Sequence, residues 1–289
     1  MKQTPAGKPL PPMADMWYRL RRNKAAMFGL GMIVLLILTA LAGMVFIDEQ
    51  TVYATHPDER LLSPGAGHIF GTDDMGRDLF IRVVYGARYS LTFGIVCTLL
   101  SLVCGAVLGA SAAFFGGKVD SVITFVLDAV ICIPNTLLSL SLVAVLGLGF
   151  RNLIIAITIS SIPSFARIIR SIVLGVVGQE YIEAARAIGV SSARTIFIHV
   201  LPNAIGLIIV NAAMNVSGLI MSAAGLSFIG MGIQPPDPEW GAMLSDSLKY
   251  MRTCPHIVIF PGLAIVLTAL SFNLLGDGLS EALDPRMKE

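Results

Sequence analysis

Residues 25–47 read AAMFGLGMIVLLILTALAGMVFI, an unbroken run without a charged side chain that directly follows the basic segment RLRRNK at 19–24. The hydrocarbon core of a bilayer is about 30 Å thick, and about 20 helical residues cross it. The run therefore predicts a membrane span. A signal peptide also turns from basic to apolar, but its apolar region is shorter than this one. The only match to a cleavage site, ALA at 40–42, is weak and lies inside the run, so we expect an uncleaved anchor.

The composition of the whole chain agrees with this first segment. Of 289 residues, 55% are hydrophobic and 13% are charged, and the mean hydropathy is +0.78. Soluble proteins carry about 25% charged residues. The net charge of +1 favours neither a nucleic-acid-binding protein nor a basic peripheral membrane protein. The four cysteines form no CxxC pair and no Cys/His cluster, so we expect buried thiols and no metal site.

Five further apolar runs lie at about 87–115, 119–147, 150–173, 201–228 and 256–280. The turns between the second, third and fourth runs are short and rich in glycine and charge, FGGKVD and GLGFRN, which predicts helical hairpins. The runs are too long for the strands of a β-barrel and do not alternate. The sequence therefore predicts an all-α integral membrane protein with six transmembrane helices, made of an N-terminal segment over 1–24 and one transmembrane domain over 25–289.

The distribution of basic residues predicts the orientation. With both termini inside, thirteen of the 20 basic residues fall in inner segments and the spans beside them, and seven fall in outer segments. Cytoplasmic loops carry the excess of Lys and Arg. We therefore expect both termini, and the polar segment 174–200, on the cytoplasmic side.

Two long outer loops, at about 48–86 and 229–255, carry more acidic than basic residues. The first contains TDDMGRD at 72–78, whose three carboxylates suggest calcium. Asp73 and Asp74 are adjacent, however, and an EF-hand needs alternating ligands. We expect an ordered turn in which Asp73, Arg77 and Asp78 pair locally. The loops are also candidates for docking an outside protein, through five residues: Asp73, Asp74, Arg77, Asp78 and Trp240.

Several residues inside the spans have two interpretations. Gly105 and Gly109 form a GxxxG pair, which allows helix backbones to approach closely. Asp128 lies near the middle of the third run, where an ionisable group is expected to face the bundle interior or a wet cavity. Asn211 and Asn215 lie four apart on one helix face. Asp128 and both asparagines are candidates either for lining a transport path or for structural contacts between helices.

Motifs for catalysis are absent from the sequence. A P-loop needs GxxxxGK[ST], but near Gly117 and Lys118 the first glycine is replaced by Ala112 and the hydroxyl residue by Val119. The sequence contains no GxSxG or HExxH motif, and its four histidines are scattered. We therefore expect no enzyme activity, no metal and no cofactor in this chain.

Residues 183–202, EAARAIGVSSARTIFIHVLP, interrupt the apolar pattern. QEYIEAARA at 179–187 is a good helix former, and Glu180 and Glu183 suit a helix start. Glu183 could pair with Arg186, one turn later. Gly189 breaks the helix or allows another surface to approach closely, and Ser191 or Ser192 could cap a second short helix. The physical pattern fits a docking element and a linker on the lipid surface equally well.

The same stretch resembles the EAA motif of ABC importer permeases, through Glu183-Ala184-Ala185, Gly189 and the final Leu201-Pro202. The family often has isoleucine three residues before this proline, where His199 stands here. Three further segments resemble the C-type permeases of dipeptide, oligopeptide and nickel importers: FGTDDMGRDLFIRVVYGARYSL at 70–91, GMGIQPPDPEWGAMLSD at 230–246 and FPGLAIVLTALSFNLLGDGLSEALDPR at 260–286.

The resemblance implies a six-span half-channel that imports peptides, with nickel or a metal chelate as the alternative substrate. It implies four partners or partner groups: a second related permease, two cytoplasmic ATPases that hold ATP and Mg, an extracytoplasmic solute-binding protein, and the bacterial inner membrane. The coupling loop to the ATPases would contain Glu183, Ala184, Ala185, Arg186 and Gly189. A stand-alone secondary transporter that uses Asp128 as an ion site is the alternative from another class; such transporters often show internal repeats, and none is evident here.

Overall fold

The computed structural model describes residues 12–283, without the side chains of residues 12–15, Arg186 and Ala193. Within that range every regular element is a helix, and the only β contact is an isolated bridge between Thr72 and Asp78. The helices are α1 (Pro12–Arg22), α2 (Lys24–Phe46), α3 (Glu49–Tyr53), η1 (Pro57–Glu59), α4 (Leu79–Phe115), α5 (Gly117–Ile131), α6 (Asn135–Leu146), α7 (Phe150–Val177), α8 (Glu180–Ala187), α9 (Ser192–Arg194), the π-helix η2 (Thr195–Val200), α10 (Leu201–Phe228), α11 (Trp240–Ser247), η3 (Leu248–Tyr250) and α12 (His256–Leu283).

Five helical segments in the described range are long and apolar enough to cross a membrane, and the bent pair of α5 and α6 makes a sixth. The five are α2, α4, α7, the continuous segment Thr195–Phe228 and α12. The predicted all-α architecture is confirmed, and six spans agree with the prediction when the bent pair is counted as one.

The third predicted span, 119–147, is not one straight helix. α5 and α6 meet at an angle of 83°, with the break at residues 132–134. Pro134 has no backbone N–H, and its ring disfavours a helical conformation at the residue before it. The apolar composition on both sides concealed the bend, and the proline was its only local signal.

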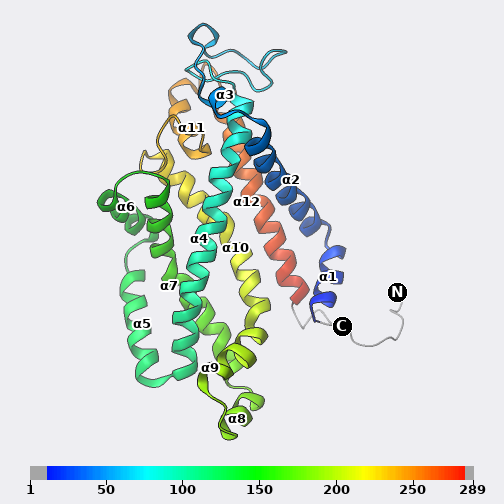
Figure 1. Cartoon of the computed structure of the whole chain (residues 1–289), viewed down its shortest axis with the longest axis vertical. Coiled ribbons are helices and arrows are strands. Elements are labelled where there is room, and N and C mark those ends of the chain that lie inside the picture. The colour runs from blue at the N-terminus through cyan, green and yellow to red at the C-terminus, as the bar shows by residue number, and fades with distance from the viewer. Residues whose placement is uncertain (1–11, 284–289) are drawn as a thin grey trace.

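The central helix of the bundle is α4, which runs along most of the molecule and packs against α7, α10 and α2 (Figure 1). Its closest neighbour is α7. A Cβ atom placed on Gly105 would lie 2.7 Å from the Phe165 Cβ, and one on Gly109 would lie 2.3 Å from the Ala166 carbonyl oxygen. The close helix approach predicted from the GxxxG pair is therefore confirmed, and its partner is α7.

We expect Gly105→Ala to destabilise the protein by about 1–3 kcal/mol, because the added methyl group overpacks the contact between α4 and α7. Thermal unfolding of the purified protein in detergent measures the change. Gly218→Ala is the matched control, because a Cβ there meets no atom within 4 Å. Equal stability of the two variants would contradict the close packing.

Two boundaries differ from the sequence prediction. α4 begins at Leu79, well before residue 87, because the Asp78 carboxylate accepts a hydrogen bond from the Ile81 N–H at 2.9 Å and caps the helix. α7 continues to Val177, beyond residue 173. Arg82 interrupts the apolar pattern in the first turns of α4, whereas the residues added at the end of α7, 174–177, are Leu-Gly-Val-Val.

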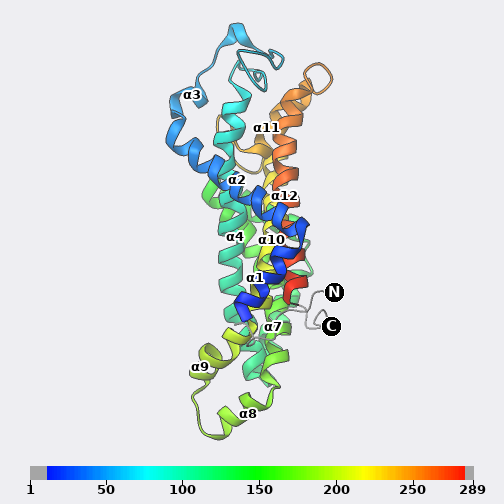
Figure 2. The same ribbon diagram turned by 90° about the vertical axis from the view of Figure 1, so that its right-hand side faces the viewer.

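The two loop regions lie at opposite ends of the molecule. Figures 1 and 2 show α3, α11 and the long loops at one end and α8 with α9 at the other. α1 lies beside the last turns of α12, at the level where α2 begins. Four basic residues that contributed to the predicted orientation, Lys2, Lys8, Arg286 and Lys288, lie outside the described residues.

Candidate functional site

The polar loop at the α8 end forms a helix with a defined stop. After α8, the backbone of Gly189 has φ +80°. The Val190 N–H donates to the Ala185 carbonyl oxygen at 3.1 Å, and the Ile188 N–H donates to that of Ala184 at 3.1 Å. The Gly189 conformation with the bond from Val190 is the Schellman ending of a helix, which glycine favours because φ is positive. The helix break predicted at Gly189 is confirmed.

α8 is held against the bundle by one apolar side chain. Ile182 is fully buried in a cluster that contains Phe114, Ile169, Val173 and Val200, from α4, α7 and η2. Ala185, one turn further along, is also buried. These contacts place α8 as a rigid projection of the bundle and fix which of its faces points outward.

The outward face of α8 carries Glu183, Ala184 and Ala187, and Ile188 follows with 80% of its surface exposed. The resemblance places Ala184 and Ala185 together in the coupling loop. The structure distinguishes them, because the helix turns Ala185 toward the bundle. The side chain of Arg186 lies outside the described residues, so its pairing with Glu183 remains a prediction.

The segment after Gly189 is not an independent short helix. α9 leads directly into η2 and α10, and the whole stretch Thr195–Phe228 is continuous. Ser191 occupies the N-cap position, but its side chain makes no capping hydrogen bond; its carbonyl oxygen accepts from the Thr195 N–H at 2.9 Å and from the Thr195 hydroxyl at 3.1 Å. The loop is therefore one short helix joined by a glycine turn to α9 and to the span that follows it.

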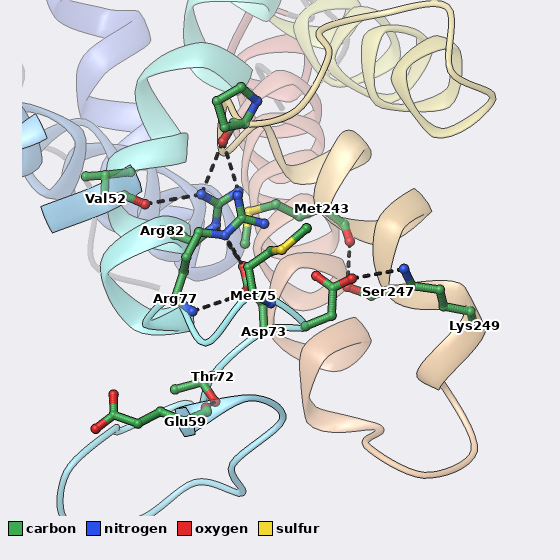
Figure 3. Close-up of polar contacts among 12 residues, drawn as sticks. Val52, Glu59, Thr72, Asp73, Met75, Arg77, Arg82, Met243, Ser247 and Lys249 are labelled. Atoms are coloured by element: carbon green, nitrogen blue, oxygen red, sulfur yellow. Dashed lines mark hydrogen bonds and ion pairs between the residues drawn. The ribbon is translucent and has the colours of Figure 1, made fainter. Parts of the chain in front are cut away.

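At the opposite end, Figure 3 shows two of the predicted docking residues, Asp73 and Arg77, inside a cap formed by the two long loops and the start of α4. Asp73 accepts from the Arg77 Nε at 2.7 Å and from the backbone N–H groups of Met75 and Arg77 at 2.8 and 3.0 Å. Asp74 pairs with Lys249 at 2.9 Å, which joins the first outer loop to the second. The ordered turn predicted for 72–78 is confirmed for Asp73 and Arg77.

We had expected Asp78 to pair with Arg77, but it does not. Besides capping α4, its carboxylate contacts the His68 Nδ1 at 2.7 Å. Trp240 is 1% exposed, and its indole N–H donates to the Val83 carbonyl oxygen at 2.9 Å. Trp240, Asp73 and Arg77 are therefore too buried in the isolated chain to contact another protein directly, and they act by shaping the cap.

Two residues of this cap, Arg82 and Glu239, were not among the site residues predicted from the sequence. Arg82 is 2% exposed; it lies 3.4 Å from the Asp73 carboxylate and donates to the carbonyl oxygens of Val52 and Pro236 at 3.1–3.2 Å. Glu239 is buried and caps α11 by accepting from the Ala242 N–H at 2.9 Å, and burial raises the pKa of its carboxyl group. For Arg82, the signal available in the sequence was a charged residue within the otherwise apolar stretch LFIRVVY.

The candidate path residues take different roles. Asp128 pairs with Arg167 of α7 at 2.5 Å, and both side chains are about half exposed. Asp128 therefore does not point into the interior of this chain; it makes a contact between helices on an open face. Asn211 and Asn215 donate to carbonyl oxygens one turn earlier in their own helix, those of Leu207 and Asn211, at 2.8 and 2.7 Å.

No group of histidine, cysteine or acidic residues in the described part of the chain is arranged to hold a metal ion. All four cysteines are free thiols, and of these only Cys97 is fully buried; Cys104 and Cys132 are exposed on the chain surface, contrary to our expectation. In a membrane span such exposure means contact with lipid or with another subunit.

Comparisons with known proteins match nearly the whole chain. Residues 105–289 match the family described as binding-protein-dependent transport system inner membrane component, and residues 11–64 match the N-terminal TM domain of oligopeptide transport permease C. The dipeptide transport system permease protein of Alkalihalophilus pseudofirmus is 43% identical over 277 residues, 96% of this chain and 91% of that protein. The glutathione transport system permease proteins of Pectobacterium atrosepticum and Escherichia coli O6:K15:H31 are 40% and 42% identical, each over 96% of this chain and 92% and 91% of their own lengths.

Proposed function

Since the chain belongs to the family of inner membrane components of binding-protein-dependent transport systems, we propose that it carries small peptides and that α8 couples its movements to partner ATPases. The chain is a multi-pass permease subunit of an ABC importer, a class that works with ATPases and with a substrate-binding protein. Peptide is supported as the substrate class by the names of the dipeptide and glutathione permeases that it resembles.

The observation that carries the coupling proposal is the geometry of α8. Ile182 fixes the helix to the bundle, while Glu183, Ala184 and Ile188 remain exposed at the end opposite the cap. An exposed short helix with an apolar side chain suits a groove of another protein. Because α8 is attached to the ends of α7 and α10, a movement of its receptor is transmitted to both spans.

The remaining subunits complete the proposed machine. A second, related permease forms the other half of the path, and two ATPases on the cytoplasmic side hold ATP and Mg²⁺. Both termini of this chain lie in the cytoplasm, and the cap around Asp73 and Trp240 shapes the face that receives the solute-binding protein. The excess of basic residues in the inner segments supports this orientation.

Ile188→Ala is expected to weaken ATPase binding about tenfold without lowering the stability of the permease, because the side chain is exposed in the isolated chain. Copurification of the ATPases and thermal unfolding measure the two effects separately. Ile182→Ala, in the preceding helix α8, is the paired variant. It should lower stability by about 2–5 kcal/mol, because it empties a buried site. Full ATPase binding by Ile188→Ala would contradict the proposed contact.

Substrate class is tested in proteoliposomes that contain this chain with its partner permease, ATPases and binding protein. We expect ATP-dependent uptake of a labelled dipeptide or glutathione and no uptake of nickel. Uptake of nickel alone would overturn the peptide assignment while leaving the coupling proposal intact. Uptake without the ATPases would overturn the coupling proposal itself.

A further inference from the structure

A pocket of about 300 Å³ lies between α1 and the last turns of α12. Its walls are Arg19, Arg22 and Asn23 on one side and Gly278, Glu281 and Ala282 on the other. The volume is at the small end of the range for ligand pockets. None of the residues that line the pocket belongs to α8 or to the cap, so its charged lining is a feature separate from both.

The pocket adjoins a packed apolar cluster. Ala282 of its lining is buried together with Leu20, Ala26 and Leu279. A Cβ atom on Gly278 would lie 2.2 Å from the Ala26 Cβ, so glycine is what allows the start of α2 to meet α12 here. The Asn23 side chain accepts from the Ala26 N–H at 3.0 Å and donates to the Glu281 carboxylate at 2.7 Å. These two hydrogen bonds fix the position of the basic wall relative to Glu281 on the opposite wall.

The pocket lies at the level of a membrane surface. α2 enters its apolar run immediately after Lys24, and α12 becomes polar at Asp277 and Glu281, near its end. Trp17 and Tyr18 are exposed on α1, with the Arg21 guanidinium 4.9 Å from the Trp17 ring and that of Arg22 5.8 Å from the Tyr18 ring. Aromatic and basic side chains of this kind mark the boundary between headgroups and acyl chains.

We propose that this pocket binds the headgroup of a membrane phospholipid, with the phosphate on the arginine wall and an ammonium group on Glu281. Arginine guanidinium groups are suited to phosphate oxygens. A carboxylate on the facing wall would repel a simple anion, but it complements a cation attached to the phosphate. Phosphoethanolamine carries both charges, and its ammonium group donates hydrogen bonds. The trimethylammonium group of phosphocholine cannot donate any, which makes it the discriminating comparison.

Native mass spectrometry of the assembled transporter, delipidated and then exposed to lipids of defined headgroup, tests the proposal. We expect the transporter to retain more phosphatidylethanolamine than phosphatidylglycerol, whose headgroup offers hydroxyl donors. Phosphatidylcholine should be retained least. Arg22→Gln should reduce phosphatidylethanolamine retention about fivefold. Glu281→Gln, which can still accept from Asn23, should abolish the preference over phosphatidylcholine.

Arg21→Gln is the matched control, because Arg21 lies on the same helix but does not line the pocket. A loss of lipid with Arg21→Gln equal to that with Arg22→Gln would overturn the site in favour of general surface charge. Equal retention of all three lipids by the unmodified chain would overturn the role of Glu281. Inorganic phosphate binding that depends on Arg22, without lipid retention, would overturn the membrane as the source of the ligand.

Discussion

Replacing Gly189 by valine is expected to reduce ATP-driven uptake at least tenfold while the permease still folds and inserts. The backbone at Gly189 has φ +80°, which a β-branched residue adopts only with strain of about 1–3 kcal/mol. Relieving that strain would break the helix ending made by the Val190 N–H and would turn the exposed face of α8 away from its receptor. A Cβ at this position meets no atom of the chain within 4 Å, so direct clash in the isolated permease is not the cause.

Uptake and substrate-stimulated ATP hydrolysis in proteoliposomes measure the Gly189→Val effect, with size-exclusion chromatography as the check on folding. Gly189→Asn is the conformational control, since asparagine tolerates positive φ better than other residues. We expect it to retain much of the activity. Gly178→Ala, at a glycine with φ −80°, controls for side-chain addition elsewhere in the loop. Unchanged coupling in Gly189→Val would refute the role of this turn, and an equal loss in both Gly189 variants would assign the effect to bulk against the ATPase.

Arg82→Met is expected to destabilise the protein by about 3–5 kcal/mol, the cost of removing one partner from a buried ionic network. Arg82 is buried and contacts the Asp73 carboxylate and the carbonyl oxygens of Val52 and Pro236. These contacts join the first outer loop, the start of α4 and the second outer loop. Methionine fills similar space but leaves the carbonyl oxygens without a donor. The expected result is a lower unfolding temperature and a disordered cap.

Thermal unfolding and limited proteolysis of the outer loops measure the Arg82 effect. Arg60→Met is the matched control, because Arg60 is exposed in the same loop region and its replacement should change stability by less than about 0.5 kcal/mol. Arg82→Lys should recover only part of the stability, because a lysine cannot reach three acceptors in the planar arrangement of a guanidinium. If Arg82→Met unfolds at the same temperature as Arg60→Met, the network does not hold the cap together.

Several features of the fold were predictable because they depend on nearby residues alone. The apolar runs identified the spans, the GxxxG pair identified a close helix contact, and Gly189 identified the end of α8. The early start of α4 was missed because Arg82 interrupts the apolar pattern of its first turns. The bend after α5 was missed because residues on both sides of it are equally apolar.

In the candidate site, too, short sequence patterns located the segments, but they did not predict which side chains are buried. The EAA pattern indicated the loop for which we propose a coupling role, but Ala184 and Ala185 were equivalent in sequence. Only the packing of Ile182 decided which of the two alanines is exposed. Trp240 and Asp73 were predicted to face a partner because they stand in polar loops. The structure buries them, because two loops distant in sequence fold over each other.

The sequence by itself determined that this protein is a six-span helical membrane protein with a polar loop at 174–200 and that it belongs with the importer permeases. Those properties follow from hydrophobic length, charge distribution and short motifs. Only the tertiary structure decided that Arg82 contacts Val52 and Pro236, which lie 30 and 154 positions away in the sequence. It also decided that Asn23 contacts Glu281 and that Ile188, and not Ala185, is exposed. These depend on which helix faces pack together, and packing is set by contacts between segments that are remote along the chain.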